Sequence, residues 1–181
     1  MKHIMVDLEC LDSSNTPAII SLGAVYFDFA AGSLGEKFYC EVSLGGLKEQ
    51  LSRGLTMSLE TIYWWTQQSD EAREVWSPKL GKVTTEEMLN KFSGFCSRGE
   101  NVRIWGNGAT YDNIGLRNCY KVFGIKCPWK YQGDRCYRTV KNMFGNRAAL
   151  DRSGTHHNAL DDAVTQAEHL LAMTKGLKIN E

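Results

Sequence analysis

The pattern of strands and helices in this sequence predicts an α/β fold, with a central mixed five-stranded sheet flanked by helices. Three strand-like runs come first, and only a short turn separates the second from the third, which is typical of an antiparallel hairpin. Helical patterns then alternate with two short strands, an arrangement that favours parallel pairing. Hairpin strands combined with parallel strands make a mixed sheet, and helices must cover it.

The first three strands are expected at residues 4–9, 18–29 and 34–42. In the first strand, Ile4, Val6 and Leu8 alternate with Met5, Asp7 and Glu9. This alternation is the two-residue period of a strand. The other two strands are rich in β-formers and flank Ala31-Gly32-Ser33, a composition that favours a hairpin turn. These strands are therefore expected to form the antiparallel part of the sheet.

The segment after the hairpin is predicted to be a loop followed by helices. Residues 44–55 contain three glycines and no clear periodicity, so we expect a loop there. Ser58 and Ser69 can each cap a short helix, and the acids that follow Ser69 suit the positive end of a helix. A helical insert therefore spans about residues 56–80.

Helices alternate with strands in the second half of the chain. A capping-box pattern at Thr84 precedes one apolar stripe, which predicts a helix. Residues 102–105 have the pattern of a buried strand, and Asp112 opens a helix that Gly124 can end. The remaining expected elements are a short strand near residues 129–132, a helix that ends near Gly145 and a final helix at about residues 158–175.

Length and composition predict one compact domain that spans residues 1–181. Hydrophobic residues make up 43% of the chain and include five Trp, seven Tyr and seven Phe, which is enough for a sizeable core. The formal net charge is zero, so any nucleic-acid binding must come from a local surface.

Six cysteines without a Cys-x-x-Cys pair predict reduced thiols. We expect a cytoplasmic protein with no membrane partner, because no run approaches the roughly 20 apolar residues of a membrane span and the start is too charged for a signal peptide.

Asp7 and Glu9 are the most informative acids in the chain. They lie two residues apart on the first strand, so their side chains project from the same face. Two carboxylates this close resist joint ionisation unless a cation or a proton neutralises them. Because Mg²⁺ and Mn²⁺ prefer oxygen ligands, the pair predicts a divalent-metal site. The alternative is an edge strand whose acids face water.

Asp112 and Asp162 have an ordinary explanation when each is taken alone. Both fall in the first turn of an expected helix, where a carboxylate stabilises the macrodipole by roughly 0.3–1 kcal/mol. Asp162 lies away from the centre of the apolar stripe of the last helix, so the helix pattern alone does not place it at a functional site. His157 with Asp162 also has the same spacing as His156 with Asp161, so spacing alone leaves the register open.

Three segments form a joint pattern along the chain. They are Asp7-Leu8-Glu9, then Asp112 after Trp105-Gly106-Asn107-Gly108-Ala109-Thr110-Tyr111, and finally His157-Asn158-Ala159-Leu160-Asp161-Asp162-Ala163. This pattern resembles the three motifs of the DEDDh, or DnaQ-like, superfamily of 3′-5′ exonucleases. Within this superfamily, the chain is similar to a phage and bacterial branch described as exoribonuclease-like. Two stretches carry this similarity, Thr61-Ile62-Tyr63-Trp64-Trp65 and Gln68-Ser69-Asp70-Glu71-Ala72. The resemblance runs from Asp7 to about Leu171.

The resemblance implies an RNase H-like fold and a metal-dependent 3′-5′ exonuclease. It makes Asp7, Glu9, Asp112 and Asp162 metal ligands and His157 the general base, and the alanines of the third motif select this histidine–aspartate pair. The implied cofactors are two Mg²⁺ or Mn²⁺ ions per active site. The implied reaction releases nucleoside 5′-monophosphates from the 3′ end of single-stranded RNA or DNA, with RNA slightly favoured. A homodimer is compatible with the relatives that dimerise.

Two features predict contacts with nucleic acid. Residues 130–152 contain six basic residues against two acids, which favours phosphate binding, although a solvated helix face is the alternative. The candidate phosphate contacts are Arg135, Arg138 and Lys141. Trp64 and Trp65 point about 100° apart on a helix and cannot both face one core, so one of them is free to stack on a base. Partial burial against another helix is the alternative for that side chain.

The sequence alone is also compatible with other functions. The same metal site could serve an endonuclease or a phosphodiesterase that acts on short oligonucleotides. The chain could instead be a catalytically weak, metal-dependent module that binds nucleic acid. Product analysis separates these functions, because only a 3′-5′ exonuclease shortens a strand stepwise from its 3′ end.

Overall fold

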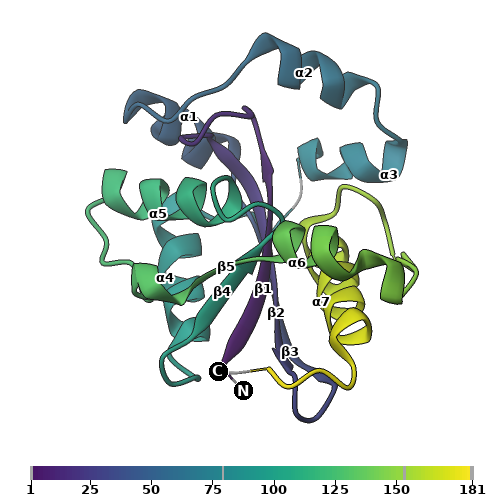
Figure 1. The fold of residues 1–181 in the computed structure, drawn as a ribbon. Coiled ribbons are helices and arrows are strands. Elements are labelled where there is room, and N and C mark those ends of the chain that lie inside the picture. The colour runs from purple at the N-terminus through teal and green to yellow at the C-terminus, as the bar shows by residue number, and fades with distance from the viewer. Residues whose placement is uncertain (1, 79, 153, 180–181) are drawn as a thin grey trace.

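The computed structural model describes residues 2–78, 80–152 and 154–179, and it contains a five-stranded sheet with helices on both faces (Figure 1). The strands are β1 (His3–Cys10), β2 (Ile19–Asp28), β3 (Ser33–Glu41), β4 (Arg103–Gly106) and β5 (Asp134–Cys136), in the spatial order β3-β2-β1-β4-β5. The β1–β2 and β2–β3 pairs are antiparallel, whereas β1–β4 and β4–β5 are parallel. The predicted mixed sheet and its hairpin are confirmed.

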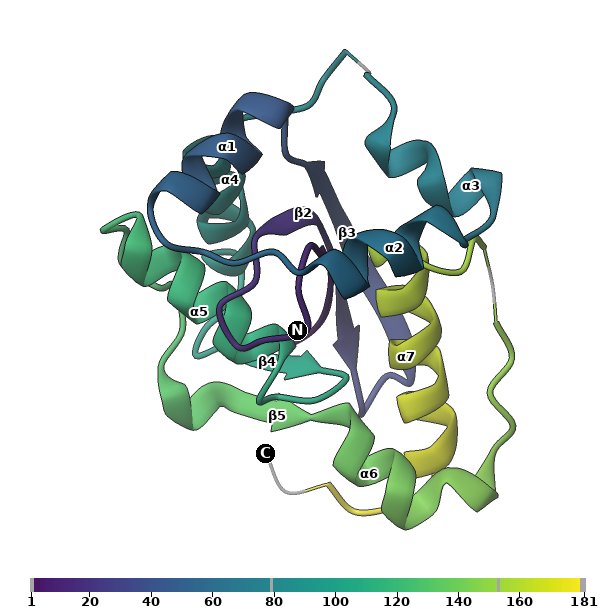
Figure 2. The same ribbon diagram turned by 90° about the horizontal axis from the view of Figure 1, so that it is seen from above.

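The helices divide between the two faces of the sheet (Figure 1, Figure 2). One face is covered by α4 (Thr85–Cys96) and α5 (Asp112–Val122), and the other by α6 (Tyr137–Phe144) and α7 (Ala159–Thr174). The remaining helices are α1 (Leu44–Ser52), α2 (Leu59–Thr66) and α3 (Asp70–Arg73), with short 3-10 turns η1 (Glu74–Trp76), η2 (Tyr131–Gly133) and η3 (Gly145–Arg147). Across the described residues, every helix is too short or too polar to span a bilayer.

Side-chain alternation along β1 assigns its residues to two apolar clusters. Ile4 and Val6 belong to the larger cluster, together with residues of α4 and α5. Met5 belongs to the second cluster, together with residues of α6 and α7. Because successive strand residues point to opposite faces, Asp7 and Glu9 lie on the same side as Met5 and face α7. The alternation that predicts β1 thus also directs both carboxylates to one face.

The predicted loop at residues 44–55 is wrong, because α1 occupies most of it. Ser43 caps this helix by accepting a hydrogen bond from the Gly46 N–H at 3.2 Å. The buried Gln50 side chain accepts from the Ile19 N–H at 2.7 Å and donates to the Ile19 carbonyl at 2.9 Å. A Cβ on Gly46 would lie 2.6 Å from Val42, so the glycine permits close packing of the helix. These long-range contacts outweigh the low helix propensity of glycine.

The short strand expected near residues 129–132 is also misplaced. The strand is β5 at Asp134–Cys136, and the preceding residues form the turn η2. Trp129 is buried beside the sheet, where its indole N–H donates to the Asp134 carboxylate at 2.7 Å. Trp129, at the start of the expected strand, therefore packs as an anchor for the turn.

The other predicted elements are confirmed with shifted ends. The hydroxyls of Ser58, Ser69 and Thr84 cap α2, α3 and α4 by accepting backbone N–H groups. Gly124, at a φ of 66°, follows the end of α5. All six cysteines are free thiols, four of them buried, as the sequence predicts.

Candidate active site

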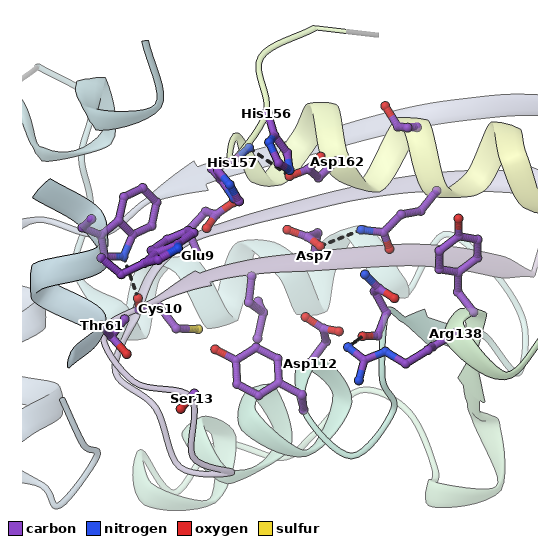
Figure 3. Close-up of a pocket in the computed structure, with 18 of the residues that line it drawn as sticks. Asp7, Glu9, Cys10, Ser13, Thr61, Asp112, Arg138, His156, His157 and Asp162 are labelled. Atoms are coloured by element: carbon purple, nitrogen blue, oxygen red, sulfur yellow. Dashed lines mark hydrogen bonds between the residues drawn. The ribbon is translucent and has the colours of Figure 1, made fainter. Parts of the chain in front are cut away.

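A cavity of about 490 Å³ opens near the carboxyl end of β1, and acidic side chains lie at its base (Figure 3). Asp7 and Glu9 come from β1, Asp112 from the first residue of α5 and Asp162 from the first turn of α7. His157 lines the same cavity from the segment before α7. The structure thus brings together all five residues that the three sequence motifs contain.

Close contact between α7 and the sheet determines where Asp162 lies. On β2, Gly23 pairs with Asp7, and a Cβ on this glycine would lie 2.1 Å from the Ala159 backbone. Ala159 and Ala163 are both 0% exposed, so small side chains line the face of α7 that packs here. As a result, carboxylate oxygens of Asp7, Glu9 and Asp162 lie within 4.8 Å of one another.

Asp112 approaches the cavity from the α5 side of the sheet (Figure 3). It is 3% exposed, and a Cβ on Gly106 at the end of β4 would lie 2.8 Å from its Cβ. Glycine at this position therefore allows the carboxylate to sit against the strand. Its Oδ2 is buried without a hydrogen-bond partner among the described residues.

The acidic cluster resists full ionisation. Burial raises the pKa of Glu9 to about 8, and the charges of Asp162 and Asp112 add to this effect. Burial also raises the pKa of Asp112 to about 7. The pKa of Asp7 lies well above its ordinary value because of burial and the charges of Asp112 and Glu9, while Gln166 donates to its Oδ1 at 2.8 Å. A bound cation would relieve the repulsion that otherwise favours protonation.

The histidine of the third motif is held in an unusual backbone conformation. His157 has a φ of 64°, and its backbone N–H donates to the Asp162 Oδ2 at 3.0 Å. The imidazole meets the edge of the Trp64 ring at 4.7 Å and stacks on His156 at 3.7 Å between centroids. Burial, followed by the charge of His156, lowers the pKa of His157. The neutral imidazole, which can accept a proton, is therefore favoured at neutral pH.

The two neighbouring tryptophans have different surroundings. Trp65 is 3% exposed, and its indole N–H donates to the Cys10 carbonyl at 3.0 Å. Trp64 is 40% exposed and lines the cavity beside His157. The expectation that one of the pair faces away from the core is met, and the free side chain is Trp64.

The three predicted phosphate-binding residues also differ in whether they line the cavity. Arg138 and Lys141 on α6 line the cavity, and Arg138 donates to the Asn107 carbonyl at 2.6 Å. Arg135 is not among the lining residues of this cavity. Its guanidinium instead donates to the carbonyls of Gln132 and Asp134 at 2.8 and 2.9 Å. The structure therefore separates Arg135 from the other two predicted contacts.

Comparison with known families identifies the chain. Residues 2–174 match the family model described as the 3′-5′ exoribonuclease Rv2179c-like domain. The chain belongs to this family. It is therefore a 3′-5′ exonuclease. No curated protein matches the sequence.

Solved structures share the fold of this Rv2179c-like domain. The nuclease domain of 3′hExo, a DEDDh family member bound to rAMP, is 15% identical with a TM-score of 0.62, over 99% of this chain and 96% of that chain. Exonuclease X in complex with 5′ overhanging duplex DNA is 13% identical with a TM-score of 0.59, over 97% and 92%. E. coli Exonuclease I in complex with a dT13 oligonucleotide is 12% identical with a TM-score of 0.61, over 96% of this chain but only 41% of that chain. These likenesses confirm the predicted RNase H-like fold, which the chain shares with the 3′hExo domain, a DEDDh family member.

Two further residues of the Rv2179c-like domain contact the acidic cluster. The sequence patterns do not single out Gln166, although it follows Asp162 by four residues and so lies on the same helix face. Arg152 enters the sequence argument only as part of the basic segment. In the structure, its Nη1 donates to the Asp162 Oδ1 at 2.8 Å. That contact joins segments whose pairing no local pattern specifies.

Proposed function

We propose that this exonuclease removes nucleoside 5′-monophosphates from the 3′ end of single-stranded nucleic acid, favours RNA over DNA, and uses two Mg²⁺ or Mn²⁺ ions. The observation that supports this most is the cluster of Asp7, Glu9 and Asp162 oxygens within 4.8 Å, beside the buried Asp112. The preference for RNA rests on the exoribonuclease description of the family.

The residues of the cluster fit a hard divalent cation. All four acids offer carboxylate oxygens, which Mg²⁺ and Mn²⁺ prefer as ligands. Burial raises the pKa of Glu9 and of Asp112 by disfavouring the charged carboxylates, and a bound cation would favour their ionisation. The buried Oδ2 of Asp112 has no protein partner among the described residues and is available to a cation. Asp7, Glu9, Asp112 and Asp162 would hold the ions.

The side chains of the cavity have separate tasks in this mechanism. When bound, the divalent ions supply a nucleophilic hydroxide at neutral pH and positive charge near the departing oxygen. His157 accepts the proton of the attacking water, a role that typically supplies about 10²- to 10⁴-fold in rate. Trp64 and His156 each make an aromatic contact with the His157 ring, which restricts its movement. Gln166 orients the Asp7 carboxylate by donating to its Oδ1.

Substrate binding is assigned to the rim of the same cavity. The exposed Trp64 ring is available to stack on a base, which is worth roughly 1–3 kcal/mol and tolerates any sequence. Arg138 and Lys141 are available to bind backbone phosphates. Neither contact reads base identity, so we propose a nuclease without strong sequence preference. Homodimer formation and a cytoplasmic location stay predictions from the sequence.

The test uses single-stranded RNA and DNA of one sequence, each labelled at the 5′ end. Incubation with Mg²⁺ or Mn²⁺ is expected to give a ladder that shortens from the 3′ end, faster for RNA, and chelator should abolish it. Asp7→Asn should abolish the ladder in a folded protein. The control Asp28→Asn removes an acid at the end of β2, outside the cavity, and should leave the ladder intact.

Other outcomes would contradict the proposal. Internal fragments at the earliest times would indicate an endonuclease, and cleavage restricted to dinucleotides would indicate a phosphodiesterase for short oligonucleotides. A mobility shift without products would indicate a binding module. Wild-type rates in Asp7→Asn would show that the acidic cluster is not the site of hydrolysis.

A further inference from the structure

An arginine occupies one oxygen of the Asp162 carboxylate. Arg152 Nη1 donates to Oδ1 at 2.8 Å, while the His157 backbone N–H donates to Oδ2 at 3.0 Å. The Arg152 side chain is 47% exposed, whereas that of Asp162 is 13% exposed. A cation bound at Oδ1 and the guanidinium would therefore compete for the same oxygen.

The backbone on both sides of Arg152 is anchored to α7. On one side, the Nε2 of His169 lies 3.0 Å from the Ala148 carbonyl, and on the other the Thr155 N–H donates to the Asp161 Oδ2 at 2.7 Å. The carbonyl can only accept, so this His169 nitrogen is the donor. These anchors keep Arg152 beside the cavity, while about half of its side chain is exposed to solvent.

The alternative partner for this guanidinium is a phosphate. Arg152 lines the same cavity as Arg138 and Lys141, so it lies on the rim assigned to the nucleic-acid backbone. Guanidinium groups bind phosphate and carboxylate oxygens with similar, often two-pronged, hydrogen bonding. Release from Asp162 would thus leave Arg152 with a suitable ligand close by.

We propose, on the basis of the function proposed above, that Arg152 exchanges partners during substrate binding. In the cation-free protein it neutralises Asp162. Arg152 would leave Oδ1 when the acidic cluster holds a divalent cation, and its guanidinium would then bind a phosphate of the nucleic acid. Cation binding and phosphate binding are coupled in this way, because the first makes Arg152 available for the second.

Metal affinity provides the first test, since it does not depend on catalysis. Mn²⁺ binding to the full chain is measured by titration calorimetry without nucleic acid. Arg152→Gln removes the competing guanidinium, so Mn²⁺ should bind about two- to fivefold more tightly, the range expected for loss of an exposed ion pair. Arg138→Gln is the matched control, because it removes the same charge from the same cavity but from a guanidinium bound to the Asn107 carbonyl. A gain in Arg152→Gln that does not exceed the control would overturn the proposed competition.

Nucleic-acid affinity provides the second test. Anisotropy of a labelled single-stranded RNA is measured in Ca²⁺ and in chelator, with a gel to check that the RNA stays intact. In Ca²⁺, Arg152→Gln should weaken binding by about tenfold or more, as expected for a lost charge-assisted contact. In chelator the same substitution should have little effect, because Arg152 is then bound to Asp162. Equal losses in both conditions would contradict the coupling.

The two tests separate this inference from the proposed function. If the unaltered protein binds Mn²⁺ and degrades RNA but Arg152→Gln changes neither affinity as stated, only the partner exchange is wrong. If the unaltered protein binds no Mn²⁺, the proposed function and the exchange both fail. Arg152→Lys keeps the charge without the forked geometry and should give intermediate values, so it serves if Arg152→Gln folds poorly.

Discussion

The pairs His156/Asp161 and His157/Asp162 have the same residue types at the same spacing, yet the fold gives their two acids different surroundings, while both histidines line the cavity. Asp161 accepts the Thr155 N–H at 2.7 Å and is not among the cavity-lining residues. Asp162 faces the acidic residues of β1, and His157 lies against an exposed tryptophan. Since neighbours on a helix point about 100° apart, a shift of one position is enough to separate a structural acid from a site acid.

The contact between α7 and β2 decides which acid reaches the cavity. Gly23 lets the Ala159 backbone approach so closely that a single Cβ would lie 2.1 Å away. The methyl side chains of Ala159 and Ala163 are too small to lift the helix away from the sheet or to rotate it. The lesson is that small residues of the third motif act through packing, by setting the rotation of the helix that carries Asp162.

The largest expected difference between the pairs is catalytic. Asp162→Asn should lower kcat by about a thousandfold, because loss of a cation ligand removes several kcal/mol of transition-state stabilisation. The matched Asp161→Asn should change kcat less than about threefold and lower the unfolding free energy by about 1 kcal/mol through its weakened bond to Thr155. Steady-state rates on a labelled oligonucleotide and thermal melts would measure both. Similar rates in the two variants would contradict the assignment.

The next largest difference is expected between the effects of His157 and His156 on kcat. His157→Ala should reduce kcat by about 10²- to 10⁴-fold as a lost general base, whereas His156→Ala should keep it within about threefold. His156 helps to lower the pKa of His157, so its removal should raise that pKa. The acid limb of the pH–rate profile should therefore move to higher pH in His156→Ala. A profile that does not move would show that the stacked imidazole has no electrostatic influence on the base.

A glycine substitution tests the packing that distinguishes the pairs. Gly23→Ala should destabilise the fold by about 1–3 kcal/mol through overpacking against α7, and it should reduce activity by displacing Asp162. Gly45→Ala in α1 is the control, because its Cβ would meet only the Ser43 hydroxyl at 3.8 Å. This control should gain about 0.5–1 kcal/mol from better helix propensity. Denaturant unfolding measures both, and equal effects would refute the close-packing argument.

The smallest expected effect concerns the pH dependence of stability. The pKa of Glu9 rises from 4.5 to about 8 on folding, so between these values the folded state keeps a proton that the unfolded state releases. Metal-free stability should therefore fall as pH rises through this window, and Mg²⁺ should offset the fall by replacing the proton. Because Asp162 contributes to the raised pKa of Glu9, Asp162→Asn should reduce the fall by about 1 kcal/mol, and Asp161→Asn should not. The measurement is the unfolding free energy of both variants from pH 4.5 to 8, with and without Mg²⁺. An equal fall in the two variants would contradict the prediction.

Local sequence patterns were sufficient for most elements of the fold. The alternation of β1, the serines before α2 and α3 and the capping pattern at Thr84 each involve residues within a few positions of one another. The helix α1, which contains Gly45 and Gly46, escaped prediction because contacts that stabilise it come from Ile19 and Thr85, which no local window relates to the helix. Strand β5 was misplaced because Trp129 serves as a packing anchor and not as a strand residue.

The sequence by itself determined the chemistry that is present in this protein. It placed Asp7 and Glu9 on one strand face and put a histidine five residues before Asp162 at the start of a helix. It also showed that Trp64 and Trp65 cannot both face one core. Each of these conclusions follows from the period of a strand or a helix, which depends only on neighbours in the chain.

Only the tertiary structure decided which of these groups meet. It brought Asp162 to the acidic residues of β1, buried Trp65 while leaving Trp64 exposed, kept Arg135 off the cavity lining and brought Arg152 onto a carboxylate ten residues further along the chain. The physical reason is that the buried face of a helix is set by packing against distant segments. At Gly23 that packing is a backbone contact between β2 and α7, which lie more than a hundred residues apart in sequence.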